Sequence, residues 1–153
     1  MHDPWEIGAN RSAGVVVLPG GVRVRGRSLR RPLPPGPHPT YGLSLTGWPP
    51  PRTPWENTWV GWPDFGLPAR WQSAAAALVN AYDACGTQRV EVACGGGRGR
   101  TGTGLACLAV CAGLSPTSAV EYVRASYHPH AVETPWQAWY VEWFGRQGLR
   151  AGR

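Results

Sequence analysis

A cysteine and an arginine stand at the two ends of a glycine-rich stretch, where residues 94–100 read Cys-Gly-Gly-Gly-Arg-Gly-Arg. Glycine adopts positive φ readily, so successive backbone N–H groups of such a stretch can point inward and bind an anion. The planar guanidinium of Arg100 can bind two oxygens of one phosphate group. A helix N-terminus and a nearby cation both stabilise a thiolate, which would make Cys94 a nucleophile for phosphorus.

The elements on either side of this loop have to hold it in place. The β-branched run before Cys94 predicts a central strand over Arg89–Ala93. The apolar period after the loop predicts a helix over Thr101–Ala112. A loop between a strand and the start of a helix lies where backbone N–H groups and the helix dipole favour an anion.

The rest of the chain alternates between strand and helix patterns. Two apolar segments, Gly14–Leu18 and Val22–Arg25, flank a Pro-Gly-Gly turn and predict a hairpin. Further elements are expected as strands at Tyr41–Leu45 and Asn57–Gly61 and as helices at Ala69–Ala84, Pro116–Ser126 and Pro135–Arg146. We therefore expect one α/β domain over residues 1–153, with a central mixed, mostly parallel sheet flanked by helices. Residues 1–56 would form the hairpin and a Pro-rich segment, and residues 57–147 the core that carries the chemistry.

The motif Cys94-x5-Arg100-Thr101 resembles the signature loop of the cysteine-based protein tyrosine phosphatases, including their dual-specificity branch. Residues 62–68 read Trp-Pro-Asp-Phe-Gly-Leu-Pro and resemble the mobile loop that carries the general acid of that family, here Asp64. Residues 131–137 resemble, more weakly, the loop that orients the hydrolytic water. These matches extend from about residue 57 to residue 144, and they imply a tyrosine-phosphatase-like fold.

The resemblance implies a reaction in two displacements. Cys94 attacks phosphorus while Asp64 protonates the leaving oxygen, and Asp64 then takes a proton from water. Gln137 would position that water, with Glu133 as a second water-positioning residue. Thr101 would donate to the sulfur as it leaves. The implied phosphate-binding residues are Gly95, Gly96, Gly97, Arg98, Gly99 and Arg100. No metal and no other cofactor takes part in this chemistry.

Three positions depart from the usual family pattern. Ala93 replaces the histidine that normally precedes the nucleophile, so a phosphate-binding protein without turnover stays open. Glu133 stands where tyrosine-specific members often carry glutamine, and Gln137 matches better. Arg98 fills a position that is often apolar, and a basic residue there is associated with highly charged substrates such as phosphoinositides. The resemblance thus implies a phosphomonoester hydrolase, foremost a protein tyrosine phosphatase, with an inositol, sugar or nucleotide phosphatase as the alternative.

Composition excludes several other classes of protein. All 15 basic residues are arginine, so the lysine-dependent phosphate loop of nucleotide hydrolases is excluded. The pattern Gly97-x-Gly99-x-x-Gly102 fits a dinucleotide fingerprint, but a helical pattern over residues 115–127 replaces the second parallel strand which that fold needs. A net charge of +6 favours anionic partners. Because the arginines form no dense run, we expect phosphorylated substrates and no nucleic acid.

The cysteines and the start of the chain bear on its compartment. The four cysteines form no Cys-x-x-Cys pair, so no zinc site is predicted. Cys107 and Cys111 are expected in the core, and a disulfide between Cys85 and Cys94 stays open. Residues 1–14 lack a signal-peptide pattern, and no apolar run is long enough to span a membrane. A reactive thiol needs reducing conditions, so we expect a cytoplasmic protein. The lysine-free composition is typical of G+C-rich genomes and suggests a bacterial source, and the oligomeric state stays open.

Two periodic patterns complete the predictions, one of arginines and one of aromatic residues. Arginines alternate along the second hairpin strand and share one of its faces, which we interpret as a solvated face; a basic patch that steers an acidic substrate is the alternative. These arginines, with the pair that follows, are Arg23, Arg25, Arg27, Arg30 and Arg31. Aromatic residues at helical spacing predict a core stripe on the last helix, formed by Trp136, Trp139, Tyr140 and Trp143.

Overall fold

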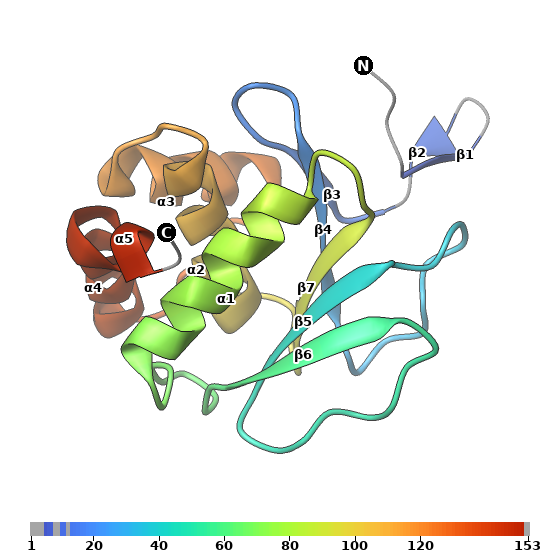
Figure 1. Cartoon of the computed structure of the whole chain (residues 1–153), viewed down its shortest axis with the longest axis horizontal. Coiled ribbons are helices and arrows are strands. Elements are labelled where there is room, and N and C mark those ends of the chain that lie inside the picture. The colour runs from blue at the N-terminus through green and yellow to red at the C-terminus, as the bar shows by residue number, and fades with distance from the viewer. Residues whose placement is uncertain (1–4, 8–9, 12, 152–153) are drawn as a thin grey trace.

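A computed structural model describes residues 5–7, 10–11 and 13–151, and its central element is a five-stranded sheet in the order β3-β4-β7-β5-β6 (Figure 1). The strands of this sheet are β3 (Val15–Val17), β4 (Arg23–Ser28), β5 (Tyr41–Thr46), β6 (Glu56–Gly61) and β7 (Val90–Cys94). β3 runs antiparallel to β4, whereas β4, β7, β5 and β6 are parallel. The sheet is thus mixed and mostly parallel, and the predicted hairpin is its antiparallel edge. A separate pair, β1 (Glu6–Ile7) and β2 (Asn10–Arg11), precedes it.

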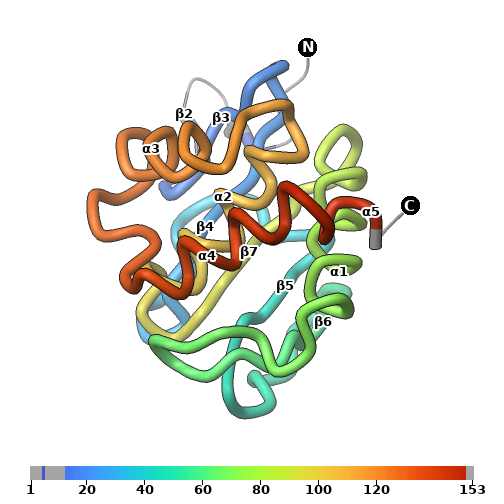
Figure 2. Tube along the Cα trace, turned by 90° about the vertical axis from the view of Figure 1, so that its left-hand side faces the viewer, coloured from blue at the N-terminus to red at the C-terminus, as the bar shows by residue number. Residues whose placement is uncertain are grey.

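The helices lie together on one face of this sheet (Figures 1 and 2). They are α1 (Trp71–Ala84), α2 (Gly99–Cys111), α3 (Pro116–Ser126) and α4 (Pro135–Trp143), followed by the π-helix η1 (Phe144–Gly148) and a short α5 (Leu149–Ala151). α2 is the central helix, and every residue from Gly99 to Val110 is buried. Gly104 allows the helix to approach the sheet closely, because a Cβ there would lie 3.1 Å from Leu45 and 3.2 Å from Val92. The most buried strand, β7, and the most buried helix, α2, therefore meet at the loop that carries Cys94.

The face formed by Arg23, Arg25 and Arg27 is not solvated, contrary to the sequence-based prediction. Only 1% of Arg25 is exposed, and its Nε lies 2.8 Å from Oε2 of Glu91 on the neighbouring strand. Arg27 Nε lies 2.9 Å from the same oxygen, and the Arg25 guanidinium lies over the Trp5 ring. The prediction was wrong because β4 is an interior strand, so Arg25 and Arg27 face Glu91 across the parallel pairing with β7. Burial also lowers the pKa of Arg25.

Removing the buried carboxylate of Glu91 should destabilise the fold. Glu91→Gln would leave two buried guanidinium groups without a counter-ion, and we expect the free energy of unfolding to fall by about 3–5 kcal/mol. Urea denaturation followed by tryptophan fluorescence measures this change. Glu142→Gln is the matched control because it breaks an exposed pair with Arg146, and there we expect a loss below about 0.5 kcal/mol. Equal losses in both variants would contradict a role for the buried cluster.

The aromatic stripe predicted on the last helix is confirmed for Tyr140 and for Trp143, which packs against the core, and it is wrong for Trp136 and Trp139. Trp136 and Trp139 are 41% and 61% exposed, whereas Tyr140 is buried. The buried stripe instead has the helical spacing of Gln137, Tyr140, Val141 and Phe144. Residues 136 and 139 lie one position before residues 137 and 140 and so point away from that stripe. Aromatic character alone did not indicate which face would be covered.

Candidate active site

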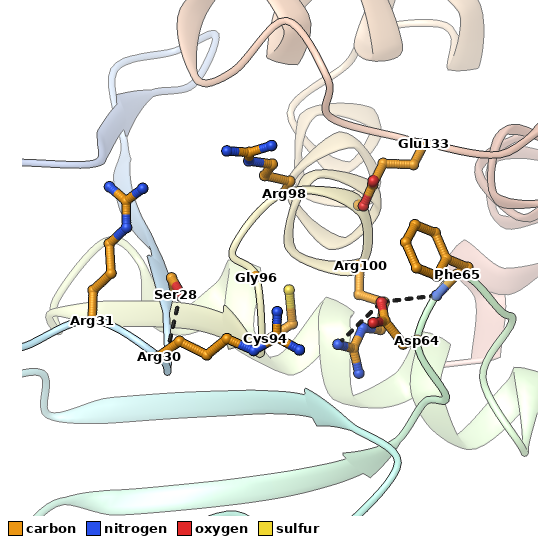
Figure 3. A pocket seen from close by; sticks show the side chains of 11 residues that line it. Ser28, Arg30, Arg31, Asp64, Phe65, Cys94, Gly96, Arg98, Arg100 and Glu133 are labelled. Atoms are coloured by element: carbon orange, nitrogen blue, oxygen red, sulfur yellow. Dashed lines mark hydrogen bonds and ion pairs between the residues drawn. The ribbon is translucent and has the colours of Figure 1, made fainter.

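A cavity of about 350 Å³ opens where β4 and β7 end, next to the start of α2 (Figure 3). Seven of the residues predicted to take part in chemistry line it: Asp64, Cys94, Gly96, Arg98, Gly99, Arg100 and Glu133. They come from three separate segments, namely the loop after β6, the β7–α2 connection and the segment before α4. Among the described residues, no group of three or more His, Cys, Asp or Glu side chains could hold a metal ion.

The glycine loop supports the sulfur directly. The backbone N–H of Gly97 donates to Cys94 Sγ across 3.1 Å, and Gly97 has a φ of 71°. A side chain at position 97 would collide with Ser28, since its Cβ would lie 2.7 Å from the Ser28 nitrogen. Glycine is therefore required there by both the dihedral angle and the space. This contact directs an N–H donor of the loop at the sulfur.

Two hydroxyl groups hold the loop from outside. Ser28 Oγ donates to the carbonyl of Gly95 across 2.8 Å, and the Tyr127 hydroxyl donates to the carbonyl of Gly97 across 2.5 Å. Burial, with a smaller contribution from Cys94, raises the pKa of Tyr127, so its hydroxyl stays protonated and remains a donor. With these carbonyl groups bound on the outer side, the loop can keep its N–H groups for an anion.

Arg100 lies deep in the cavity, 5% exposed, at the start of α2. One of its terminal nitrogens donates to the carbonyl of Trp62 across 2.9 Å, and the other lies 3.4 Å from Asp64 Oδ1 (Figure 3). The arginine of the signature loop is therefore bonded to the loop that carries the predicted acid. The hydroxyl of Thr101 is buried and has no hydrogen-bond partner in the described part of the chain, and its donation to sulfur stays a prediction.

The loop that carries Asp64 is fastened at several points. Trp62 is buried, and its indole N–H donates to the carbonyl of Gly66 across 2.8 Å. The N–H of Phe65 donates to Asp64 Oδ1 across 3.0 Å, and Phe65 adopts a φ of 57°, which is unfavourable for a residue other than glycine. The Trp136 indole N–H donates to the Phe65 carbonyl. These contacts hold the carboxyl group of Asp64 at the mouth of the cavity.

The two residues proposed to position water occupy different places. Glu133 lines the cavity and lies against Gly99, where a Cβ would be 2.2 Å from its Oε1. Gln137 is fully buried and caps α4: its Oε1 accepts from the N–H groups of Glu133 and Thr134, and its Nε2 lies 3.3 Å from the Gly66 carbonyl. Gln137 therefore stabilises both the start of α4 and the loop that carries Asp64. The water-positioning roles of Glu133 and Gln137 stay predictions.

Four residues that were not predicted as site residues also line the cavity: Ser28, Arg30, Arg31 and Phe65. The first three follow from the parallel pairing of β4 with β7, which places Ser28 opposite Cys94 in the register. Arg30 reaches back toward the loop, so that a Cβ on Gly95 would lie 3.4 Å from its guanidinium. For Arg30 and Arg31 the signal in the sequence was the alternative interpretation of these arginines as a basic patch that steers an acidic substrate.

The cysteines and the helices settle two further sequence-based predictions. None of the four cysteines forms a disulfide, so the structure does not contain the one between Cys85 and Cys94. Burial raises the pKa of Cys85 to about 12, and it raises the pKa of the core residue Cys107 as well. Cys111 is half-buried at the end of α2.

In the part of the chain that is described, the helices are too short or too polar for a membrane span.

Comparison with known proteins places this site in context. Residues 68–136 match a family model described as PTP-SAK, "Swiss Army Knife protein, DSP-PTPase phosphatase domain", and this range includes Cys94, Arg100 and Glu133 but not Asp64. Fourteen chains of solved structures are similar to this one. One of them, described as the crystal structure of Tk-PTP in the active form, has a TM-score of 0.61 and 24% sequence identity, over 70% of this chain and 78% of that chain. No curated protein sequence matches.

Proposed function

We propose that this chain hydrolyses phosphomonoesters through a phosphocysteine intermediate, because residues 68–136 match the DSP-PTPase family model and the fold is similar to that of a tyrosine phosphatase. The observation that carries the proposal is one cavity lined by a thiol, a buried guanidinium and a carboxyl group, those of Cys94, Arg100 and Asp64. A nucleophile, an oxyanion-binding cation and a general acid are the groups that phosphoryl transfer to a thiol needs.

In the first step, the Cys94 thiolate attacks phosphorus and the bond from phosphorus to the ester oxygen breaks. Asp64 gives its proton to that oxygen, and the alcohol leaves. Arg100 and the N–H groups of the glycine loop bind the equatorial oxygens, so most of the rate enhancement comes from positioning and electrostatic stabilisation. The hydrogen bond from Gly97 to Sγ stabilises the sulfur both before attack and as a leaving group.

In the second step, water attacks the phosphocysteine and Asp64 accepts its proton. The phosphorus–sulfur bond breaks, inorganic phosphate leaves, and the thiolate of Cys94 is restored. Glu133 lies in the cavity wall, where it can contact such a water, whereas Gln137 acts on the acid loop through the carbonyl of Gly66. Thr101 can donate to the departing sulfur, and its unpartnered hydroxyl supports this role.

For the substrate, we propose the phosphotyrosine side chain of a protein. The Trp-Pro-Asp form of the acid loop favours an aryl ester, and Phe65, which is 54% exposed at the cavity, offers a ring for aromatic contact. A small, multiply charged phosphate ester is the second candidate, favoured by the three arginines at the cavity mouth, Arg30, Arg31 and Arg98. Four cysteines without a disulfide support a reducing compartment such as the cytoplasm.

The proposal is tested by turnover of a fluorogenic aryl phosphate followed by rapid acid quenching. Mass spectrometry should find a phosphoryl group on the peptide that contains Cys94 during turnover. Absence of both turnover and the phosphorylated peptide would leave only a phosphate-binding protein, the alternative suggested by Ala93. Iodoacetate labelling at mildly acidic pH is an independent check, since a thiolate reacts rapidly and a thiol slowly.

Arg100→Lys should separate charge from geometry at the phosphate site. Lysine keeps the positive charge but cannot bind two equatorial oxygens or keep the contacts to both Trp62 and Asp64. We expect kcat/KM for the aryl phosphate to fall by roughly 10²–10³-fold. Arg146→Lys, on the exposed surface of η1, is the matched control. A loss below tenfold in Arg100→Lys would contradict bidentate binding by this side chain.

A further inference from the structure

Three carbonyl groups of the signature loop accept hydrogen bonds from segments outside the loop. The N–H of Leu29 donates to the Cys94 carbonyl across 2.9 Å and continues the pairing of β4 with β7. A serine hydroxyl at the end of β4 donates to the Gly95 carbonyl, and the Tyr127 hydroxyl donates to the Gly97 carbonyl. The first half of the loop is thus held by β4 and its continuation, whereas the second half is held by a residue at the end of α3.

A bound carbonyl group also fixes the N–H group of the next residue. The peptide unit is planar and trans, so its C=O and its N–H point in opposite directions. Because the Gly95 and Gly97 carbonyls are bound on the outer side, the N–H groups of the following residues point to the inner side. Those residues are Gly96 and Arg98, and both line the cavity. Within the described part of the chain, neither N–H donates a hydrogen bond, so both are available for an anion.

The ring of Tyr127 has a defined position between two elements. The N–H of Tyr127 donates to the Val123 carbonyl across 2.8 Å, at the end of α3. The ring lies against Gly26 of β4, where a Cβ would be 2.5 Å from the ring carbon Cε1. A larger residue at position 26 would therefore displace the ring. The glycine in β4 thus makes room for the hydroxyl to reach the Gly97 carbonyl.

The strand that carries the nucleophile offers no comparable support for the second half of the loop. Ala93 precedes Cys94, is 2% exposed and has no polar atom in its side chain. Among the side chains that the structure describes, the Tyr127 hydroxyl is the one donor to the peptide between Gly97 and Arg98. Without this hydroxyl, the peptide would have no side-chain donor to keep its N–H group on the inner side.

We propose that Tyr127 is a positioning residue of the phosphate site, whose hydroxyl holds the Arg98 N–H toward an oxygen of the bound phosphate. Tyr127 itself does not contact the substrate and acts through the peptide between Gly97 and Arg98. The inference rests on the proposed phosphatase function and gives the Arg98 backbone a role that its side chain does not share. Since a preorganised donor contributes most in the transition state, its loss should weaken a transition-state mimic and slow turnover.

The test compares Tyr127→Phe with Tyr122→Phe as the matched control. Tyr122 belongs to the same helix, and its hydroxyl also donates to a backbone carbonyl, that of Val17 in the edge strand β3. Each variant loses one hydroxyl group and one hydrogen bond of the same kind, so thermal unfolding should show similar losses of stability. Vanadate, a mimic of the phosphoryl-transfer transition state, is the probe. Calorimetry measures its dissociation constant and does not depend on turnover.

Tyr127→Phe should bind vanadate about tenfold more weakly than the wild type, and kcat/KM for an aryl phosphate should fall by a similar factor. Tyr122→Phe should stay within about twofold in both measurements. Equal changes in the two variants, or a change below about threefold in Tyr127→Phe, would overturn the positioning role. Turnover that does not depend on Tyr127 would still support the phosphatase. Vanadate binding that depends on Tyr127 without any turnover would support the positioning role and refute the proposed activity.

Arg98→Ala then separates the backbone of this residue from its side chain. The variant removes the guanidinium and keeps the N–H group. In this background, Tyr127→Phe should again weaken vanadate binding by about tenfold, because the two changes affect different groups. If Tyr127→Phe has no effect once the Arg98 side chain is absent, the hydroxyl acts through the guanidinium, and the proposed route through the peptide is wrong.

Discussion

Cys94→Ser is expected to reduce kcat for an aryl phosphate by roughly 10⁴–10⁶-fold, as removal of a covalent nucleophile does in other enzymes. A serine hydroxyl does not ionise under conditions in which a cysteine thiol can ionise. No other described side chain in the cavity is a thiol. The loop geometry should survive, because the Gly97 N–H can donate to a hydroxyl oxygen as it does to Sγ. The variant should therefore still bind inorganic phosphate, which calorimetry can measure.

The control for this variant is Cys111→Ser, at the far end of α2 from the cavity, where the thiol is half-buried. It should keep activity within about threefold, since it lies outside the site and makes no contact with the reacting groups. Circular dichroism and thermal unfolding of both variants verify the fold. If Cys94→Ser retains activity within tenfold of the wild type while Cys111→Ser loses it, another group is the nucleophile.

Local patterns predicted most elements of this fold because each pattern depends on neighbours in sequence. The helix over residues 116–126 was predicted with its exact bounds, since Ser115 accepts from the Ser118 N–H and Pro116 suits the first helical turn. The strand and helix around the glycine loop were confirmed within two residues at each end. Cys94, Arg100 and Asp64 were brought to one cavity as the motif resemblance implied.

Features that depend on pairing between distant segments were missed. Arg25 was placed on a solvated face because alternation along a strand does not reveal which strand lies beside it, and here β7 supplies Glu91. The same pairing brings Arg30 and Arg31 to the cavity from a segment that matched no family motif. Trp139 was assigned to the core because helical spacing is shared by two adjacent stripes on α4, and only packing selects one. Each error concerns a partner that lies far away in sequence.

The loop that carries Asp64 is held by contacts from distant segments, and it carries the group proposed to transfer the proton. Arg100, from α2, binds both the Trp62 carbonyl and the Asp64 carboxylate, and α4 holds the Phe65 and Gly66 carbonyls through Trp136 and Gln137. The position of Asp64, the proposed acid, therefore depends both on the start of α2 and on the start of α4. Binding of phosphate by Arg100 would compete with its 3.4 Å contact to Asp64 and free that carboxyl group for proton transfer.

Asp64→Asn should isolate this proton transfer. We expect kcat for esters of strongly basic alcohols and phenols to fall by roughly 10²–10⁴-fold, the usual contribution of a positioned general acid. Asparagine keeps the shape and can still accept from the Phe65 N–H and lie beside Arg100, so loop position should be retained. The loss should shrink as the leaving group becomes less basic, because such a group departs without a proton. The measurement is kcat across a series of substituted phenyl phosphates, and the dependence on leaving-group basicity should be steeper in the variant.

The second carboxyl group in the cavity provides the comparison that identifies the acid. Glu133 lines the same cavity as Asp64 but is carried by the segment before α4. If Asp64 is the acid, kcat of Glu133→Gln should depend on leaving-group basicity as weakly as kcat of the wild type does. This holds even if the second step is slower in that variant. If kcat depends steeply on leaving-group basicity in Glu133→Gln and only weakly in Asp64→Asn, the assignment of the acid is reversed. The contact between Arg100 and Asp64 would then serve only to hold the loop in place.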